Sequence, residues 1–167
     1  MSIFSPELTQ RAAVLLAHAR DKGIKIATAE SCTGGLIAAL LTEIPGSSDV
    51  VERGFVTYSN QAKQELLEVP EGFFTPQGPG AVSEETACMM AEGTLNKSQA
   101  GLTVAVTGIA GPASDDSAKP VGLVHIALAR HDGETLHEEH QFGDIGRDQV
   151  RLKTVEAAMT LLESVLS

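Results

Sequence analysis

The sequence predicts an α/β fold, namely a three-layer α/β/α sandwich around a mixed, mostly parallel five-stranded sheet. Helical spacing of apolar residues alternates with short strand-like runs along most of the chain, which is typical of βα units. Residues 102–110 and 121–129 are almost continuously apolar, as strands buried on both faces are. The chain has 167 residues, of which 43% are hydrophobic, so we expect one core and a single domain over residues 1–167.

The first half of the chain is expected to alternate helices with strands. A helix over residues 6–20 has apolar residues at helical spacing and ends at Gly23. The elements that follow are a strand over Ile24–Ala29, a helix over Thr33–Leu41, a strand over Gly54–Ser59 and a short helix for which Asn60 is a candidate N-cap.

The second half begins with a loop over residues 70–82 that is rich in proline and glycine. Asp132-Gly133 is a hairpin signal that separates the last two strands. The expected elements are a helix capped by Ser83, buried strands over Leu102–Ala110 and Val121–Ala129, an edge strand over Glu134–Phe142 and a closing helix over Arg147–Leu166.

This order of elements brings several strand ends together. Helices separate the first three strands, so right-handed crossovers make these strands parallel. The fourth strand returns antiparallel, and the hairpin turns the fifth strand back to the original direction. The carboxyl ends of the first, second, third and fifth strands therefore share one edge, where ligands bind in open α/β sheets. The residues expected at that edge are Glu30–Thr33, Tyr58, Lys63, Thr107, Gly108 and Gly143–Arg147.

Composition narrows the classes of function. A formal net charge of −10 argues against a general nucleic-acid binder, because such proteins need a surplus of Lys and Arg. No apolar run approaches the ~20 residues that span a bilayer, and the N-terminus lacks the pattern of a signal peptide. Cys32 and Cys88 are expected to remain thiols. We therefore expect a cytoplasmic protein that binds neither nucleic acid nor membrane.

Ser31 lies within Ala29–Gly35, read AESCTGG, between a predicted strand and the start of a helix. The first amides of a helix lack internal partners, so they can hold a phosphate or a developing oxyanion. A serine at this place can attack a substrate, bind it or simply cap the helix. Gly34 and Gly35 favour a ligand site, because glycines allow a ligand close to the backbone. Cys32 is an alternative nucleophile or a small buried residue.

Other residues at the same edge have both a structural and a functional interpretation. Tyr58 and Lys63 are compatible with an ordinary strand tyrosine and a solvated helix lysine, but their expected place makes a role in the site an equal alternative. The loop TGIAGP, which starts at Thr107, either exposes backbone amides to a ligand or forms a tight turn. Arg147 is placed to clamp a phosphate, although most such arginines are solvated.

The histidines do not predict a metal site. His137 and His140 are three residues apart in a predicted strand, which places them on opposite faces. His125 lies in an apolar run and is expected to be a hydrogen-bonded core residue. No segment matches a P-loop or a Rossmann fingerprint, so we expect neither a metal nor a cofactor.

Five ordered motifs resemble the CinA C-terminal domain family, whose stand-alone members are nicotinamide-nucleotide amidases of the PncC type. The motifs are TAESCTGGLIAALLTEIPGSS, GFVTYSNQAK, GAVSE, TGIAGP and KPVG, and the match runs from about Ile26 to the last helix. The resemblance implies a three-layer α/β/α fold with a mixed sheet. It also implies metal-free hydrolysis of nicotinamide mononucleotide (NMN) to nicotinate mononucleotide and ammonia, in pyridine nucleotide salvage.

The same resemblance implies roles for individual residues. The serine of ESCTGG falls on Ser31, as nucleophile or as the group that positions a water. The tyrosine and lysine of TYSN-x-x-K fall on Tyr58 and Lys63, so that Lys63 takes the serine proton and Tyr58 orients the relay. Arg147, with Arg151 as the alternative, is expected to hold the phosphate. The residues expected to bind substrate are Cys32, Thr33, Gly34, Gly35, Thr107, Gly108 and Arg147.

One segment departs from the family pattern, and two other functions stay open. Where many relatives have a glycine-rich stretch after TGIAGP, this chain has residues 113–116, read ASDD, which puts two acids near an anionic substrate. The alternatives to a serine amidase are a non-catalytic nucleotide-binding module and a hydrolase that uses Cys32. The expected partner is the small nucleotide NMN, and a homodimer is compatible with this assignment.

Overall fold

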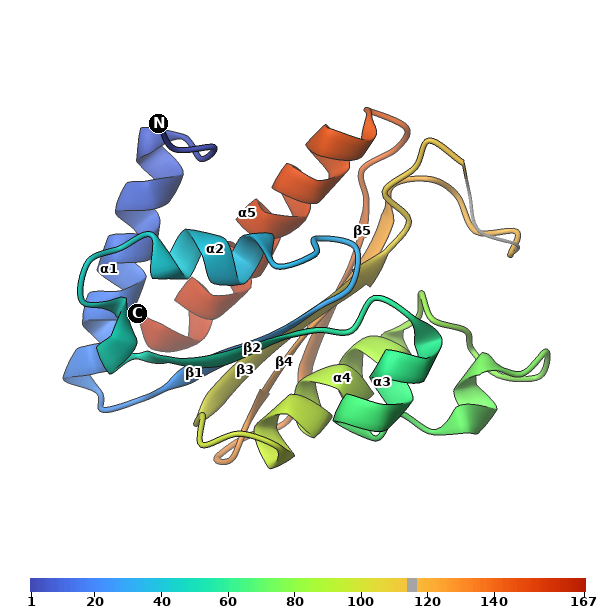
Figure 1. The fold of residues 1–167 in the computed structure, drawn as a ribbon, viewed down its shortest axis with the longest axis horizontal. Coiled ribbons are helices and arrows are strands. Elements are labelled where there is room, and N and C mark those ends of the chain that lie inside the picture. The colour runs from blue at the N-terminus through green and yellow to red at the C-terminus, as the bar shows by residue number, and fades with distance from the viewer. Residues whose placement is uncertain (114–116) are drawn as a thin grey trace.

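The computed structural model describes residues 1–113 and 117–167 and shows a β-sheet between two layers of helices (Figure 1). The two acids at positions 115 and 116, which we expect near the anionic substrate, lie outside the described residues. The helices are α1 (Pro6–Asp21), α2 (Leu36–Thr42), α3 (Asn60–Leu67), α4 (Glu84–Asn96) and α5 (Arg147–Leu166). The strands are β1 (Ile26–Glu30), β2 (Val51–Val56), β3 (Leu102–Gly108), β4 (Leu123–Arg130) and β5 (Leu136–Gln141).

The sheet has the order β2-β1-β3-β4-β5 and confirms the predicted mixed architecture. Strand β1 pairs in parallel with β2 and β3, whereas β4 pairs antiparallel with β3 and β5. Strands β1, β2, β3 and β5 therefore point the same way. In the parallel part, Glu30 of β1 is opposite Val56 of β2 and Val106 of β3, so β1 and β2 end together and β3 continues to Gly108.

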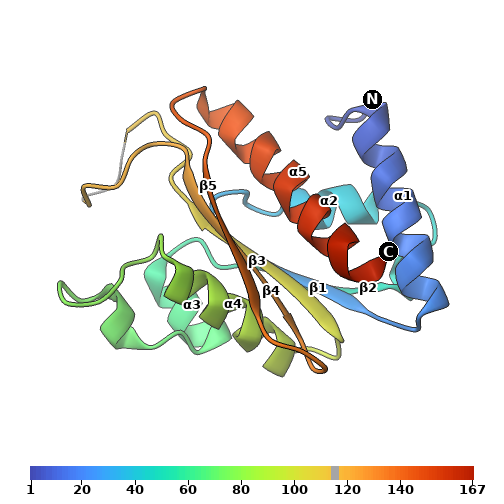
Figure 2. The same cartoon turned by 180° about the vertical axis from the view of Figure 1, so that it is seen from behind.

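Helices cover both faces of the sheet, as Figures 1 and 2 show from opposite sides. The larger hydrophobic core lies under α1, α2 and α5, and the bulky side chains of β3 and β4, such as Val104, Ile126 and Leu128, point into it. The opposite face carries small strand residues, including Ala29, Ala105 and Ala127, beneath the α3 and α4 layer. This is the predicted α/β/α sandwich. Within the described residues, no helix combines the length and the apolar character needed to cross a membrane.

Two element boundaries near the site differ from the prediction. Strand β2 covers Val51–Val56 instead of Gly54–Ser59, because this edge strand is only partly buried and has no apolar alternation to mark its limits. Helix α2 begins at Leu36 instead of Thr33, because Gly34 and Gly35 have φ of 59° and 105° and form a turn before it.

The cap of α3 is the third correction. The N-cap is Ser59 and not Asn60, since the Ser59 side chain accepts a hydrogen bond from the amide of Ala62 at 3.0 Å. Strand β2 ends at Val56, so Thr57, Tyr58 and Ser59 form an extended connection into the helix. The cap therefore fixes where the first turn of α3, which carries Lys63, starts relative to the end of the sheet.

Candidate active site

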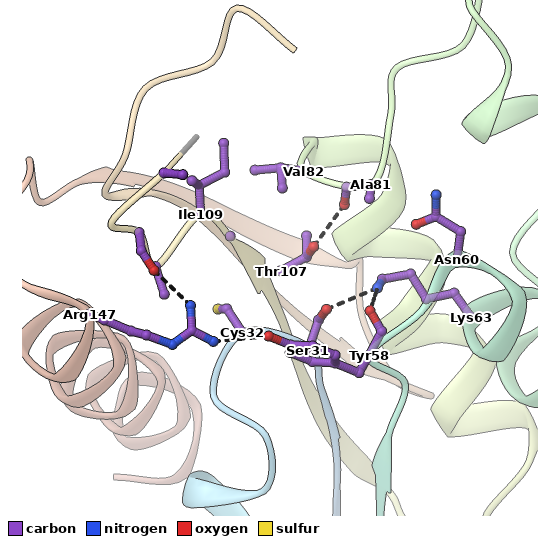
Figure 3. A pocket seen from close by; sticks show the side chains of 14 residues that line it. Ser31, Cys32, Tyr58, Asn60, Lys63, Ala81, Val82, Thr107, Ile109 and Arg147 are labelled. Atoms are coloured by element: carbon purple, nitrogen blue, oxygen red, sulfur yellow. Dashed lines mark hydrogen bonds between the residues drawn. The ribbon is translucent and has the colours of Figure 1, made fainter. Parts of the chain in front are cut away.

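A cavity of about 280 Å³ lies at the carboxyl edge of the parallel strands (Figure 3). It is bounded by the turn after β1, the start of α3, the loop before α4, the end of β3 and the start of α5. Its lining residues are Ser31, Cys32, Tyr58, Asn60, Lys63, Ala81, Val82, Thr107, Gly108, Ile109, Ala110, Gly111, Ala113 and Arg147. This is the edge that the order of strands predicted.

Ser31 and Lys63 contact each other at the base of this cavity. The Lys63 ammonium nitrogen Nζ lies 2.9 Å from the Ser31 hydroxyl oxygen, and both side chains are buried. Nζ also donates to the carbonyl oxygens of Thr57 at 2.9 Å and Tyr58 at 3.3 Å. Among the described residues, none of its hydrogen-bond partners is a carboxylate. The lysine is thus solvated by neutral oxygens and has no ion-pair partner there.

Local structure explains why this pair forms. The amide of Ser31 donates to the Val106 carbonyl at 3.1 Å, which extends the β1–β3 ladder by one bond and fixes the serine backbone. Lys63 lies one turn into α3, and its amide donates to the Ser59 carbonyl at 3.1 Å. Helical side chains lean toward the helix N-terminus, so the Lys63 chain extends back to the end of the sheet.

Burial lowers the pKa of Lys63 to about 8, because desolvation disfavours the charged ammonium and the interaction with Cys32 opposes this only in part. An ordinary lysine titrates near ~10.4 and is almost fully charged at neutral pH. A lysine with a pKa near 8 is neutral in a useful fraction of molecules, and its neutral amine can accept the proton of a hydroxyl 2.9 Å away.

Cys32 also lines the cavity, but its chemistry differs from that of its neighbour. The side chain is 5% exposed, and burial raises the pKa of the thiol to about 12, with the nearby Glu30 carboxylate acting in the same direction. A thiol is a competent nucleophile only as the thiolate. Cys32 is therefore protonated at neutral pH, which argues against the alternative of a cysteine hydrolase.

Tyr58 does not occupy the position expected of a group that orients the proton relay through its hydroxyl. The residue is 61% exposed, and its hydroxyl oxygen accepts a hydrogen bond from Arg147 Nη2 at 2.9 Å. Only the backbone carbonyl of Tyr58 contacts Lys63. The tyrosine side chain projects from the extended connection on the side away from the lysine and toward Arg147 (Figure 3).

The two arginines at the start of α5 have different surroundings. Arg147 lines the cavity, and its Nη1 donates to the Gly111 carbonyl at 2.8 Å, which leaves other guanidinium N–H groups for an anion. Arg151, one helical turn later, is not among the lining residues and donates to backbone carbonyls of the turn after β1. Of the two candidates for a phosphate contact, the geometry favours Arg147.

Three residues expected to bind substrate lie outside the cavity lining. Thr33 is fully buried, and its hydroxyl donates to the Glu30 carboxylate at 2.6 Å. Gly34 and Gly35 supply the positive φ of the turn, and side chains there would meet Arg151 and Val56. The glycine pair thus shapes the turn after β1 and does not line the cavity.

The amides of α2 are not available to a ligand either. The Glu30 carboxylate accepts from the amides of Ile37 at 2.8 Å and Ala38 at 3.0 Å. Two other amides suit a developing oxyanion. Gly108 lines the cavity, and because the amide of Ile109 donates to β4, the preceding amide faces the end of β1 and Ser31. The amide of Cys32 has no backbone acceptor among the described residues.

Sequence reasoning missed part of the lining. Asn60, Ala81 and Val82 come from the start of α3 and the end of the loop over residues 70–82, which the sequence marks as a loop without indicating where it folds. The Thr107 hydroxyl donates to the Ala81 carbonyl at 2.8 Å and ties this loop to the end of β3. The proline and glycine content gave no signal for this contact, because it joins segments that are distant in the chain.

The structure places His125, His137 and His140 as the sequence predicts. His125 is buried, and its Nδ1 lies 2.9 Å from Nε2 of His137, so it is the hydrogen-bonded core residue that the apolar run predicts. His140 instead contacts the Glu138 carboxylate at 2.9 Å. Alternation along β5 places His137 and His140 on opposite faces of the sheet.

Comparison with known proteins gives one consistent result. The family model of the CinA C-terminal domain matches residues 8–166. A CinA-like protein of Syntrophus aciditrophicus is 49% identical over 148 residues, which are 88% of this chain and 34% of that protein. A CinA-like protein of Syntrophobacter fumaroxidans is 45% identical over 148 residues, with coverage of 89% and 34%. The chain thus spans about a third of the length of these curated relatives.

Solved structures agree with this match over the whole fold. The competence/damage inducible protein CihA from Agrobacterium tumefaciens superposes with a TM-score of 0.94 at 48% identity, and all of both chains is covered. A competence-damaged protein (CinA) superfamily protein from Escherichia coli has a TM-score of 0.89 at 27% identity, with coverage of 99% of this chain and 95% of the other.

Lys63 is buried without a carboxylate partner among the described residues, which predicts that its ammonium lowers the free energy of unfolding. Its folded pKa of about 8 lies below the unfolded value near ~10.4, so the unfolded chain binds more protons between these values and stability rises with pH there. Lys63→Met should therefore be more stable than the wild type at pH 7, by about 1–3 kcal/mol, and the gap should shrink toward pH 10. Denaturant unfolding at several pH values measures the gap.

The control for this measurement is Lys97→Met. Lys97 is an exposed lysine that contacts Glu68 at 2.8 Å, so its loss should give no comparable trend over this range of pH. A gap between Lys63→Met and wild type that stays constant from pH 7 to pH 10 would contradict the lowered pKa of Lys63.

Proposed function

The chain belongs to the CinA C-terminal domain family, and we propose that it is a serine amidohydrolase that hydrolyses the carboxamide of NMN to nicotinate mononucleotide and ammonia. The observation that carries the proposal is the contact of 2.9 Å between Lys63 Nζ and the Ser31 hydroxyl at the base of a cavity. Among the described residues Lys63 has no acid partner, and a buried lysine of this kind beside a hydroxyl is an arrangement for making a nucleophile and has little value for stability.

In the proposed reaction, Ser31 attacks the carbon of the substrate carboxamide. Neutral Lys63 takes the hydroxyl proton as the C–O bond forms, which gives a tetrahedral oxyanion. The protonated lysine then gives that proton to the amide nitrogen, the C–N bond breaks, and ammonia leaves an acyl-serine. A water molecule attacks this ester with Lys63 again as the base. Collapse of the second intermediate releases the carboxylic acid and restores Ser31.

The amides of Cys32 and Gly108 are the donors that we assign to the oxyanion. They flank Ser31 from the following residue and from the end of the neighbouring strand, and preorganised backbone donors of this kind are strong contributors to acyl transfer. The amide after the nucleophile serves the same purpose in other serine hydrolases. The α2 amides, which Glu30 occupies, have no part in this scheme.

Arg147 is the residue that we assign to the anionic end of the substrate. It is a cation in the lining of the cavity of a protein with a formal net charge of −10, so it creates a local site for an anion that the rest of the surface would repel. Its hydrogen bonds to the Gly111 carbonyl and the Tyr58 hydroxyl hold the guanidinium across the cavity. Tyr58 therefore has a part in substrate binding in this proposal.

The nucleophile assignment predicts the effect of replacing Ser31. Ser31→Ala should reduce ammonia release from NMN by at least about 1,000-fold without unfolding the protein, because Ser31 supplies the oxygen of the acyl intermediate in this scheme. Cys32→Ser is the matched control and should keep substantial activity. Ammonia release within tenfold of wild type for Ser31→Ala would remove the nucleophile role, and an inactive Cys32→Ser would point to the thiol.

The lowered pKa of Lys63 predicts the pH dependence of the reaction. Because the base must be neutral, kcat/KM should fall about tenfold for each pH unit below about 8. Nicotinamide riboside serves as the control substrate, since it lacks the phosphate that also titrates near ~6. A profile that stays level for both substrates down to pH 6.5 would exclude Lys63 as the general base.

If Arg147 binds the phosphate, its replacement should change KM and leave kcat nearly unchanged. Arg147→Ala should raise KM for NMN by about 10- to 100-fold and change kcat by less than about threefold, because the phosphate does not react. For nicotinamide riboside the same variant should have little effect. Equal losses on both substrates would show that Arg147 does not bind the phosphate.

A further inference from the structure

The turn that presents Ser31 is held by a side chain from the other end of the chain. Arg151 of α5 donates from Nε to the Cys32 carbonyl at 3.1 Å and from Nη2 to the Thr33 carbonyl at 3.0 Å. Both acceptors belong to the turn between β1 and α2. Helices α2 and α5 lie on the same face of the sheet, which brings the guanidinium onto the turn (Figure 1).

A buried carboxylate also contacts the same turn. Glu30, the last residue of β1, is fully buried, and its oxygens accept from the Thr33 hydroxyl at 2.6 Å and from the amides of Ile37 and Ala38 at 2.8 and 3.0 Å. The carbonyls of the turn therefore face a cation while the first amides of α2 face an anion. This arrangement matches the charges of the groups involved.

The turn needs such restraint because regular structure does not supply it. Gly34 and Gly35 both have positive φ, and α2 has no side-chain N-cap of the usual kind. Glycines in these conformations cost little to distort, so the backbone between β1 and α2 is intrinsically soft. A Cβ built on Gly34 would lie 3.4 Å from Arg151 Nη2, which shows that the guanidinium packs directly against this part of the turn.

One backbone hydrogen bond connects the conformation of the turn to the orientation of the peptide that follows Ser31. The amide of Gly34 donates to the Ser31 carbonyl at 3.0 Å. In a trans peptide the carbonyl and the N–H point in opposite directions, so this bond turns the Cys32 amide away from the glycines. Fixing the carbonyls of Cys32 and Thr33 thus fixes the peptide that follows Ser31.

We propose that Arg151 is a positioning residue that holds Ser31 and the Cys32 amide in the reactive geometry through its two bonds to the turn. The proposal rests on the proposed function for its kinetic consequence. Arg147 and Arg151 are one turn apart on the same helix, yet only Arg147 lines the cavity. Arg147 therefore governs substrate binding, whereas Arg151 governs the rate of the chemical step.

Kinetics of Arg151→Ala and Arg151→Lys on NMN test this division. Arg151→Ala should lower kcat by about 10- to 100-fold with KM within about threefold of wild type, as expected when the reacting groups are displaced by a fraction of an ångström or more. Arg151→Lys should recover part of the loss. Millimolar guanidinium ion should restore part of kcat in Arg151→Ala, because it can occupy the place of the missing side chain. If the variant were only less stable, guanidinium ion would not raise kcat.

The matched control is Arg11→Ala. Arg11 also joins α5 to another element through a bidentate contact, at 2.9 Å to each oxygen of Glu163, but it lies on α1 away from the cavity. Its loss should leave kcat unchanged. A kcat of Arg151→Ala within threefold of wild type would overturn the proposal, as would a rise in KM without a loss of kcat.

Hydrogen exchange separates this proposal from the proposed function. In Arg151→Ala the amides of Gly34, Ile37 and Ala38 should exchange at least about tenfold faster, while those of β3 keep their wild-type rates. Unchanged exchange in the turn would overturn the positioning role even if the variant were a poor enzyme. A wild-type protein that releases no ammonia from NMN would instead refute the amidase, and the exchange rates would still decide whether Arg151 holds the turn.

Discussion

The burial of the Lys63 amine beside the Ser31 hydroxyl is the constraint on which the rest of the site depends. An amine in this position needs oxygen acceptors but no carboxylate, since an acid would keep it charged. The chain meets this requirement with the carbonyls of Thr57 and Tyr58, which are free because β2 has ended and α3 has not begun. A short helix with a serine cap then places the lysine one turn from the sheet.

The three basic residues at the edge of the sheet have different hydrogen-bond partners. Lys63 contacts only neutral oxygens, Arg147 spans the cavity between a carbonyl and a phenol, and Arg151 binds the carbonyls of the serine turn. Glu30, the buried carboxylate closest in sequence to Ser31, bonds to the helix amides and to a hydroxyl, so it does not neutralise these groups. In an acidic protein, this separation leaves the Lys63 amine with a lowered pKa and the Arg147 guanidinium beside the cavity.

The mixed sheet makes this separation feasible. Because β1 lies between β2 and β3, both neighbours hold the backbone at Ser31, through bonds to Glu30 and from Ser31 itself. The antiparallel β4 carries the chain back, so that β5 ends at the same edge and α5 starts beside the turn. Loops and helices from most of the chain thus reach one cavity.

The sequence by itself determined the order of the elements and the edge of the sheet that carries the cavity, and it made Ser31 and Lys63 candidates at that edge. Apolar periodicity, capping signals and the crossover rule depend on neighbours within a few residues, so they are visible in one dimension. The tertiary structure decided which way the Tyr58 side chain points, that Gly34 and Gly35 lie outside the cavity lining, and that Arg151 and Arg147 have different partners. These contacts join segments as far apart as β1 and α5, and a side chain's direction at such a contact depends on packing that no local pattern contains.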